Sequence, residues 1–159
     1  MQRRQLIRTV AAIAGAAAVA PALMAQTRPQ VEVWKDPNCG CCKDWVDHLQ
    51  ANGFAVRVHD SGNTAARKRL GIPDKLGSCH TGEVGAQGKR YALEGHVPAR
   101  ELRRMLKELP QAAGLAVPGM PVGSPGMDGP VYGGRKDAYD VLLVLQDGSS
   151  RVYQSYHRG

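Results

Sequence analysis

The alternation of apolar and polar positions predicts strands and helices in turn along the first part of the chain. Residues 31–34 form a short β-branched and aromatic run, and residues 54–59 alternate, so both segments are predicted as strands. Between them, apolar residues recur at the spacing of one helix face, namely Cys42, Trp45, Val46 and Leu49. This pattern predicts a helix that begins near Cys42 and ends at Gly53.

The pattern continues with a short helix, two strands and a longer helix. Ser61 or Asn63 can cap the short helix. Residues 79–84 and 89–96 are candidate strands on either side of a Gly-Ala-Gln-Gly turn. Pro98 then starts a helix with one apolar face, formed by Leu102, Met105, Leu106 and Leu109. The predicted fold class is α/β, in the order β-α-β-α-β-β-α, with a mixed central sheet flanked by helices.

The composition changes at Pro110. Residues 110–138 are rich in Gly and Pro, and this segment is predicted as a loop. The plainest interpretation of such a composition is a flexible linker.

A C-terminal hairpin is predicted at residues 139–157, with two strand-like runs around an Asp-Gly turn. We expect this hairpin to extend the same sheet. The prediction is therefore a single domain over residues 31–159, after a short linker at 26–30.

The first 25 residues have the plan of an export signal. A basic start is followed by an apolar, Ala-rich run, and small residues offer cleavage after Ala25 or Ala22. The competing interpretation is a retained membrane anchor, but the strictly apolar stretch at 10–20 is about half of the ~20 residues that a spanning helix needs. The two arginines at 3–4 resemble an incomplete twin-arginine export signal. We expect an exported protein with no stable membrane insertion after cleavage.

The formal net charge is +7, and cleavage of the predicted signal would lower it by three. The remaining basic residues are scattered, apart from the runs at 67–69 and 103–104, and neither run contains an aromatic residue. Both runs are interpreted as solvated helix faces. No nucleic-acid partner is expected.

Three of the four cysteines lie within four positions, at Cys39, Cys41 and Cys42. Cys39 and Cys42 have the Cys-x-x-Cys spacing, between a strand and a helix, in which such pairs do redox chemistry. A helix N-terminus lowers the pKa of a thiol placed there, so a good nucleophile or ligand is expected. Cys41 could reshuffle a disulfide in this loop, however, and several neighbouring sulfurs suit soft metals such as Cu(I), zinc or iron–sulfur clusters. Cys79 enters from a separate strand.

Other uses of the cysteines are less favoured. A structural disulfide between Cys39 and Cys42 closes a tiny loop and constrains the unfolded chain little. Structural zinc sites usually draw two pairs of ligands from two loops, whereas three cysteines share one loop here. The usual cysteine spacing of iron–sulfur proteins is absent. The residues by themselves indicate a soft-metal site or thiol redox chemistry.

Histidines and methionines add weaker candidates. His80 follows the fourth cysteine and is a candidate ligand or supporting group, and His96 before the last helix is a weaker one. Met120 and Met127 lie in a glycine-rich loop, and their thioethers suit Cu(I). They are candidate copper contacts or a closing flap, or else ordinary packing residues. His48 is predicted at an exposed helical position without a function.

Four separated motifs occur in order, WKDPNCGCCKDW, SCHTG, EGHVP and GLAVPGMPVGSPGM. Together they make the chain resemble, over residues 30–155, the CopG-type periplasmic copper-resistance proteins, long described as a domain of unknown function. The resemblance implies a thioredoxin-like fold in the periplasm and a multinuclear copper site on Cys39, Cys41, Cys42 and Cys79. It also implies a part in copper detoxification beside copper efflux systems. A redox role, the interconversion of Cu(I) and Cu(II), has been suggested for such proteins.

One feature departs from ordinary thioredoxins, which carry a cis-proline before the strand that faces the Cys-x-x-Cys loop. The nearest proline here is Pro73, and Ser78-Cys79 is predicted to occupy the usual proline position. A fourth ligand would then replace the substrate-peptide groove of a disulfide oxidoreductase. Packing of Pro73 against Cys39 would contradict this hypothesis.

Three functions follow from these residues. The leading one is a periplasmic copper-binding protein that holds Cu(I) and can change its oxidation state. The alternative is a thiol–disulfide oxidoreductase in which Cys39 attacks and Cys42 resolves, which leaves Cys41 and Cys79 without a role. The third is a chaperone that hands copper to an efflux pump. The copper interpretations differ in whether a change of valence is catalysed, and both stay open at this point.

Overall fold

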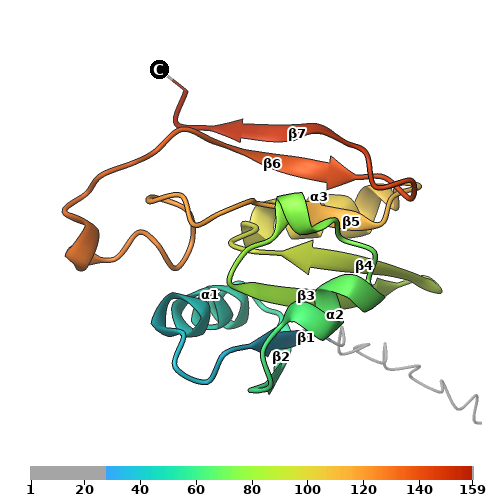
Figure 1. The fold of residues 1–159 in the computed structure, drawn as a ribbon, viewed down its shortest axis with the longest axis horizontal. Helices are drawn as coiled ribbons and strands as arrows, with labels where there is room; N and C mark the ends of the chain where they lie inside the picture. The colour runs from blue at the N-terminus through green and yellow to red at the C-terminus, as the bar shows by residue number, and fades with distance from the viewer. Residues whose placement is uncertain (1–27, 159) are drawn as a thin grey trace, which may run out of the picture.

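A seven-stranded mixed sheet runs through the middle of the structure, a computed structural model that describes residues 28–158 (Figure 1). The strands lie in the order β2-β1-β3-β4-β5-β6-β7. Neighbouring strands are antiparallel, except for the parallel pairs β1–β2 and β4–β5. The strands are β1 (Gln30–Lys35), β2 (Ala55–His59), β3 (His80–Ala86), β4 (Lys89–Glu94), β5 (Gly114–Ala116), β6 (Tyr139–Val144) and β7 (Ser150–Tyr156).

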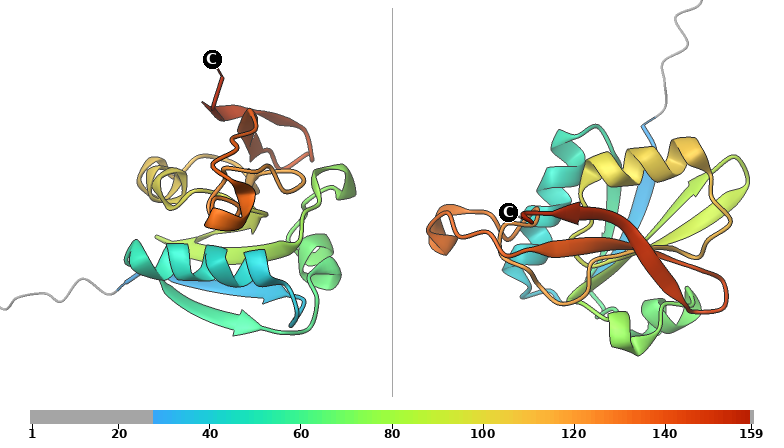
Figure 2. Two further views of the ribbon diagram at one scale, coloured as in Figure 1. Left: turned by 90° about the vertical axis from the view of Figure 1, so that its left-hand side faces the viewer. Right: turned by 90° about the horizontal axis from the view of Figure 1, so that it is seen from above.

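Helices cover both faces of the sheet (Figure 2). One face carries α1 (Gly40–Ala51) and α3 (Ala99–Glu108), and the other carries α2 (Thr64–Arg69) and the 3-10 turn η1 (Asp74–Leu76). A second 3-10 turn, η2 (Pro130–Tyr132), lies in the long loop between β5 and β6. The predicted α/β order through α3 is confirmed, although α1 begins two residues before Cys42.

The main apolar core lies between the sheet and the pair α1 and α3. The buried face of α1 consists of the four residues that the helical spacing predicts, Cys42, Trp45, Val46 and Leu49. From α3, Leu102 and Met105 are fully buried, while Leu106 and the C-cap residue Leu109 are partly buried. A smaller apolar group lies on the opposite face, where Ile72 and Leu76 pack with residues of β4, β5 and β6.

The flexible-linker interpretation of residues 110–138 is wrong for its first part. Residues Gly114–Ala116 form β5, which pairs with β4 on one side and β6 on the other. All three residues are buried. A strand covered on both faces needs no alternation of polar and apolar residues, so three small or apolar residues between glycines and prolines gave no periodic signal. The hairpin of β6 and β7 pairs as predicted and continues the sheet beyond β5.

The predicted export signal lies outside the described residues. Within residues 28–158, no helix combines the length and the apolar character that crossing a bilayer requires.

His48 corrects a second expectation, because it is partly buried and has a structural partner. Its Nε2 accepts a hydrogen bond of 3.0 Å from the backbone N–H of Ala99, the first residue of α3. The side chain of His48 therefore caps the N-terminus of a neighbouring helix. Burial lowers the pKa of His48, and the carboxylate of Asp128 opposes this shift.

A first prediction concerns Gly114, which has no room for a side chain. A Cβ at this position would overlap the carbonyl group of Ala92 in the paired strand β4. We expect Gly114→Ala to lower the free energy of unfolding by about 1–3 kcal/mol, as overpacking of a core does. Gly129→Ala is the matched control, because nothing lies within 4 Å of a Cβ there. Urea denaturation checks both variants, and a wild-type midpoint for Gly114→Ala would contradict the placement of β5.

A second prediction concerns the pH dependence that His48 contributes. Because its pKa is lowered in the folded state, the unfolded chain binds more protons on acidification, and stability falls as the pH drops below about 6.5. We expect His48→Ala to cost about 1 kcal/mol near neutral pH through the lost cap. The variant should then lose less further stability than the wild type between about pH 6.5 and 5. Denaturation at several pH values measures this, and identical acid slopes for the two proteins would refute it.

Candidate metal centre

The topology of the sheet brings several chain segments to one edge. Strand β1 is antiparallel to β3, so the end of β1 lies beside the start of β3, with Lys35 paired to His80. Strand β4 is antiparallel to β3, and Glu94 at its end pairs with Thr81. Strand β5 is parallel to β4 and ends at the same edge. The loops that follow β1, β4 and β5, and the residues that precede β3, therefore meet.

The loop after β1 is held by local hydrogen bonds. The N–H of Asn38 donates to the Asp36 carboxylate at 2.8 Å, and the N–H of Cys39 donates to the Asp36 carbonyl at 3.1 Å. The buried ammonium of Lys35 donates to the same carbonyl at 3.0 Å and pairs with Asp60 at 2.8 Å. These contacts place Cys39 at the N-cap of α1. The positive end of a helix favours negatively charged ligands.

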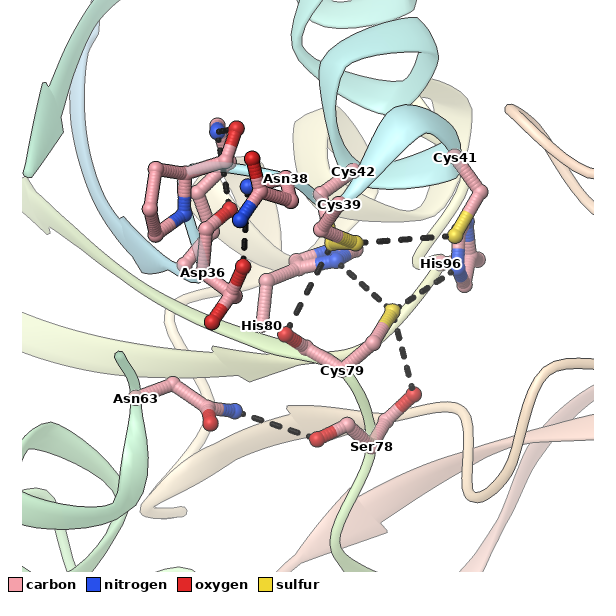
Figure 3. Close-up of a disulfide and its surroundings, with 12 residues drawn as sticks. Asp36, Asn38, Cys39, Cys41, Cys42, Asn63, Ser78, Cys79, His80 and His96 are labelled. Atoms are coloured by element: carbon pink, nitrogen blue, oxygen red, sulfur yellow. Dashed lines mark hydrogen bonds between the residues drawn. A yellow bond between two sulfur atoms is a disulfide. The ribbon is translucent and has the colours of Figure 1, made fainter. Parts of the chain in front are cut away.

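The four cysteine sulfurs converge at this helix start (Figure 3). All four lie within 4.8 Å of one another. Cys39 and Cys42 form a disulfide, while Cys41 and Cys79 are free thiols. The sulfur of Cys41 lies 3.7 Å from that of Cys39, and the sulfur of Cys42 lies 3.6 Å from the carbonyl oxygen of Cys79. Cys79, which directly precedes β3 instead of lying inside that strand as predicted, thus meets the other three cysteines, as expected from the sequence.

Cys79 also lies against two imidazoles. Its sulfur is 3.3 Å from Nδ1 of His80 and 3.2 Å from Nε2 of His96, and these three residues form a second group of clustered ligand atoms. Burial raises the pKa of Cys79 to about 12, and the nearby Cys41 adds to the rise. Without a metal, Cys79 is therefore a protonated thiol at neutral pH.

His96 has the orientation of a metal ligand. Its Nδ1 lies 2.8 Å from the carbonyl oxygen of Pro125, and a carbonyl only accepts, so Nδ1 carries the proton and Nε2 presents its lone pair toward Cys79. Metal-binding histidines are usually oriented in this way. His80 is fully buried, and its Nε2 has no hydrogen-bond partner among the described residues. Burial lowers the pKa of both imidazoles, so both are neutral, as ligands must be.

One of the two tryptophans forms the inner wall of the site. The ring of Trp45 lies 4.2 Å from the ring of His80, and its indole N–H donates to the carbonyl of Val97 at 2.9 Å. Trp34 lies elsewhere and stacks on His59. The fully buried Trp45 keeps the back of the site apolar and dry.

The loop after β5 packs against α1, the helix that carries Cys41 and Cys42. A Cβ at Gly126, where φ is +84°, would lie 2.7 Å from the carbonyl oxygen of Cys41 and 2.8 Å from the nitrogen of Trp45. Only glycine permits this close approach with this backbone conformation. Met127 is buried, and its sulfur accepts a hydrogen bond from the hydroxyl of Tyr132 at 3.2 Å. Met120 is 52% exposed.

Pro73 does not pack against Cys39, the contact that would have contradicted the prediction that Ser78-Cys79 occupies the usual proline position. It adjoins Gly148 in the turn between β6 and β7. The segment that meets the cysteine loop is Ser78-Cys79, and residues 28–158 contain no cis peptide bond.

Several residues of the site gave no sequence signal. Lys35, Pro125 and Gly126 contribute through backbone contacts or buried charge, and nothing in their local pattern distinguishes them from other loop or strand residues. The sequence favoured His80 over His96 as a candidate ligand, whereas the structure gives His96 the better-oriented nitrogen.

Comparison with known proteins finds one matching family model and related solved structures. The family model described as protein of unknown function, DUF411, matches residues 76–127. No curated protein sequence matches the chain. A solved structure of copper resistance protein CopG, form 2, is 44% identical and has a TM-score of 0.72, with 82% of this chain and 99% of that chain covered. Form 1 is 46% identical with a TM-score of 0.71, and the covered shares are 80% and 96%.

The similarity to both structures extends over almost the whole length of the CopG chains. This chain therefore belongs to the family of CopG copper resistance proteins.

Proposed function

We propose that this protein binds Cu(I) in copper resistance, with the thiolates of Cys39, Cys41, Cys42 and Cys79 as ligands. The observation that carries the proposal is the convergence of four sulfurs within 4.8 Å, three from one helix start and one from a separate segment. Soft thiolates select Cu(I) over harder ions. Because a thiolate is the ligand, the copper-binding form is the one in which the Cys39–Cys42 disulfide has been reduced.

Imidazoles complete the donor set. His96 offers a neutral Nε2 toward Cys79, and its other nitrogen is already held by Pro125. His80 offers Nδ1, which lies 3.3 Å from the same Cys79 sulfur. The loop with Met120 and Met127 packs against α1 through Gly126, which supports its proposed role as a flap, and the exposed Met120 is the candidate outer contact for copper.

More than one Cu(I) suits this site better than a single ion. One Cu(I) on four thiolates would leave three net negative charges in a half-buried place, which costs free energy. Each further Cu(I) bridged by the same sulfurs removes one of these charges. Zinc is less favoured, since three of the four cysteines come from one loop.

The neighbouring thiols also allow copper to change its oxidation state. Two Cu(II) ions can each take one electron from the thiols of Cys39 and Cys42, which gives two Cu(I), one disulfide and two protons. The disulfide present in the structure supports this part of the proposal. A thiol reductant would then have to restore the dithiol.

We propose a periplasmic location after export through the N-terminal signal, and transfer of copper to an efflux system. The signal-like first 25 residues and the membership in the CopG family support these proposals. We also assign the domain to the thioredoxin-like class. The order β1-α1-β2-α2-β3-β4-α3, with Cys39 and Cys42 at the start of α1, supports this assignment.

A thiol–disulfide oxidoreductase remains the second candidate, and the Cys39–Cys42 disulfide favours it. An extended substrate peptide would need free backbone groups beside this disulfide. Both backbone groups of Ser78 are already bonded, the N–H to Glu94 and the carbonyl to Arg67. Gly119 packs on the same segment through the Ser78 hydroxyl and the Gly77 carbonyl. The copper function therefore accounts for more of the site.

A third prediction tests copper binding directly. Anaerobic titration of the reduced protein against a chromophoric Cu(I) chelator should show tight binding of more than one copper ion. We expect Cys41→Ser and Cys79→Ser each to lower the number of tightly bound ions, because each removes a bridging sulfur.

The control for this titration is the same protein with its Cys39–Cys42 disulfide intact, which should bind fewer copper ions. Equal binding by the oxidised and reduced proteins would contradict thiolate ligation by this pair. Preference for zinc over Cu(I) in competition would make the site a zinc site.

A fourth prediction separates the two candidate functions. In an insulin-reduction assay with a thiol reductant, we expect little turnover, because both backbone groups of Ser78, beside the disulfide, are already hydrogen-bonded. Cys41→Ser should not increase that turnover. Rapid insulin reduction that survives Cys41→Ser, together with no tight Cu(I) binding, would establish the oxidoreductase instead.

A further inference from the structure

A buried ion pair lies directly behind the metal centre and has no role in the functions above. Glu94, at the end of β4, has no exposed side-chain surface, and Arg67 of α2 is 14% exposed. Nε of Arg67 lies 2.9 Å from Oε1 of Glu94. The desolvation of two such charges offsets much of their attraction, so a buried pair of this kind is weak evidence for stability. Its contacts point to another purpose.

The two side chains of the pair form hydrogen bonds to both backbone groups of a single residue. Oε1 of Glu94 accepts a hydrogen bond from the N–H of Ser78 at 2.7 Å. Nη2 of Arg67 donates to the carbonyl of Ser78 at 2.7 Å, and the side-chain amide of Asn63 donates to the same carbonyl at 3.1 Å. Ser78 directly precedes Cys79, and Figure 3 shows Asn63 reaching Ser78 below the cysteine cluster.

This segment has no other regular support. Residues 77–79 lie between η1 and β3, in neither helix nor strand, so no sheet ladder fixes them. The Arg67 guanidinium lies so close to Gly77 that a Cβ there would be 3.0 Å from its Cζ. On the other side, a Cβ at Gly95 would be 2.7 Å from the Cβ of Ser78. Side-chain hydrogen bonds and close backbone packing replace the missing ladder.

The same carboxylate also holds the strand that leads to His96. Oε2 of Glu94 accepts a hydrogen bond from the hydroxyl of Thr81 at 2.6 Å, which ties the end of β4 to the start of β3. His96 follows Glu94 by two residues, and Cys79 precedes Thr81 by two. One buried carboxylate therefore connects the segments that carry two of the candidate ligands.

We propose that Arg67 and Glu94 are positioning residues of the metal centre, which hold the Ser78 peptide so that the Cys79 sulfur meets the cysteine loop and His96. This inference rests on the proposed metal binding by Cys79. A metal centre requires its ligands to be held closely by their supporting residues. The ion pair supplies that constraint at Cys79, the one cysteine that lies away from the start of α1.

The test uses Glu94→Gln, which keeps the shape of the side chain and removes its charge, and Arg67→Met, which removes both donors. Glu83→Gln is the matched control. Glu83, on the neighbouring strand β3, is another largely buried carboxylate, with 11% of its side chain exposed. It pairs with Arg90 and Arg69.

The first readout needs no copper. In the metal-free protein with its disulfide intact, iodoacetamide alkylates the two free thiols, and mass spectrometry of peptides gives the two rates. We expect the rate at Cys79, relative to Cys41 in the same molecule, to rise about tenfold in Glu94→Gln and Arg67→Met as the segment loosens, and to stay at the wild-type ratio in Glu83→Gln.

The second readout is Cu(I) affinity of the reduced proteins in chelator competition. Loss of a residue that orients a ligand typically weakens metal binding 10–100-fold, and we expect a weakening of at least about tenfold for both pair variants and none for Glu83→Gln. Urea denaturation of each metal-free variant separates this effect from general destabilisation. Lower stability with wild-type alkylation ratio and wild-type copper affinity would overturn the proposal and make the pair purely structural.

Failure of the proposed function has a different signature. If the wild type binds no Cu(I), copper binding is refuted, while the alkylation ratio still reports whether the pair holds Cys79. If Glu94→Gln does not fold, the milder substitutions Asn63→Ala and Arg67→Lys weaken the same set of hydrogen bonds to the Ser78 backbone. An unchanged alkylation ratio in both of these folded variants would then overturn the positioning role.

Discussion

The antiparallel pairing of β1 with β3 is the constraint on which the candidate metal centre depends. It sets Lys35 opposite His80, so the loop that follows one strand and the residue that precedes the other lie side by side. Strands β4 and β5 then deliver His96 and the loop with Pro125 to the same edge. A shift of one residue in the register would turn the side chains of a strand to its opposite face, and the cluster would be lost.

The sulfurs at this edge have three competing partners. They can bind protons, form a disulfide or bind a soft metal, and the surroundings favour a different outcome at different cysteines. Burial holds Cys79 protonated in the absence of metal, while Cys39 and Cys42 pair with each other. Copper binding by all four would therefore require two electrons and the release of thiol protons. Metal affinity, redox state and pH are coupled in this site because all three act on the same atoms.

Buried polar groups are concentrated around this edge, in contrast to the apolar core beneath α1 and α3. Lys35 holds the carbonyl before the cysteine loop, and Arg67 and Glu94 hold the peptide before Cys79. Both arrangements act on segments outside helices and strands. Where the chain must leave regular structure to present a ligand, the backbone groups it exposes are satisfied by buried side chains instead of ladder partners.

The sequence by itself determined the local structure: the apolar face of α1, the strands before and after it, and the hairpin of β6 and β7 follow from periodicities that act over a few residues. It also determined the chemistry, because the spacing of Cys39, Cys41 and Cys42 at a helix start already indicates soft-metal or redox use. Only the tertiary structure decided that β5 is an inner strand, that His48 caps α3, and that His96 faces Cys79 with its tautomer held by Pro125. The two histidine contacts to backbone groups join residues 29 and 51 positions apart. A backbone carbonyl or N–H is the same in every residue, so the sequence carries no mark of which one a distant side chain will meet.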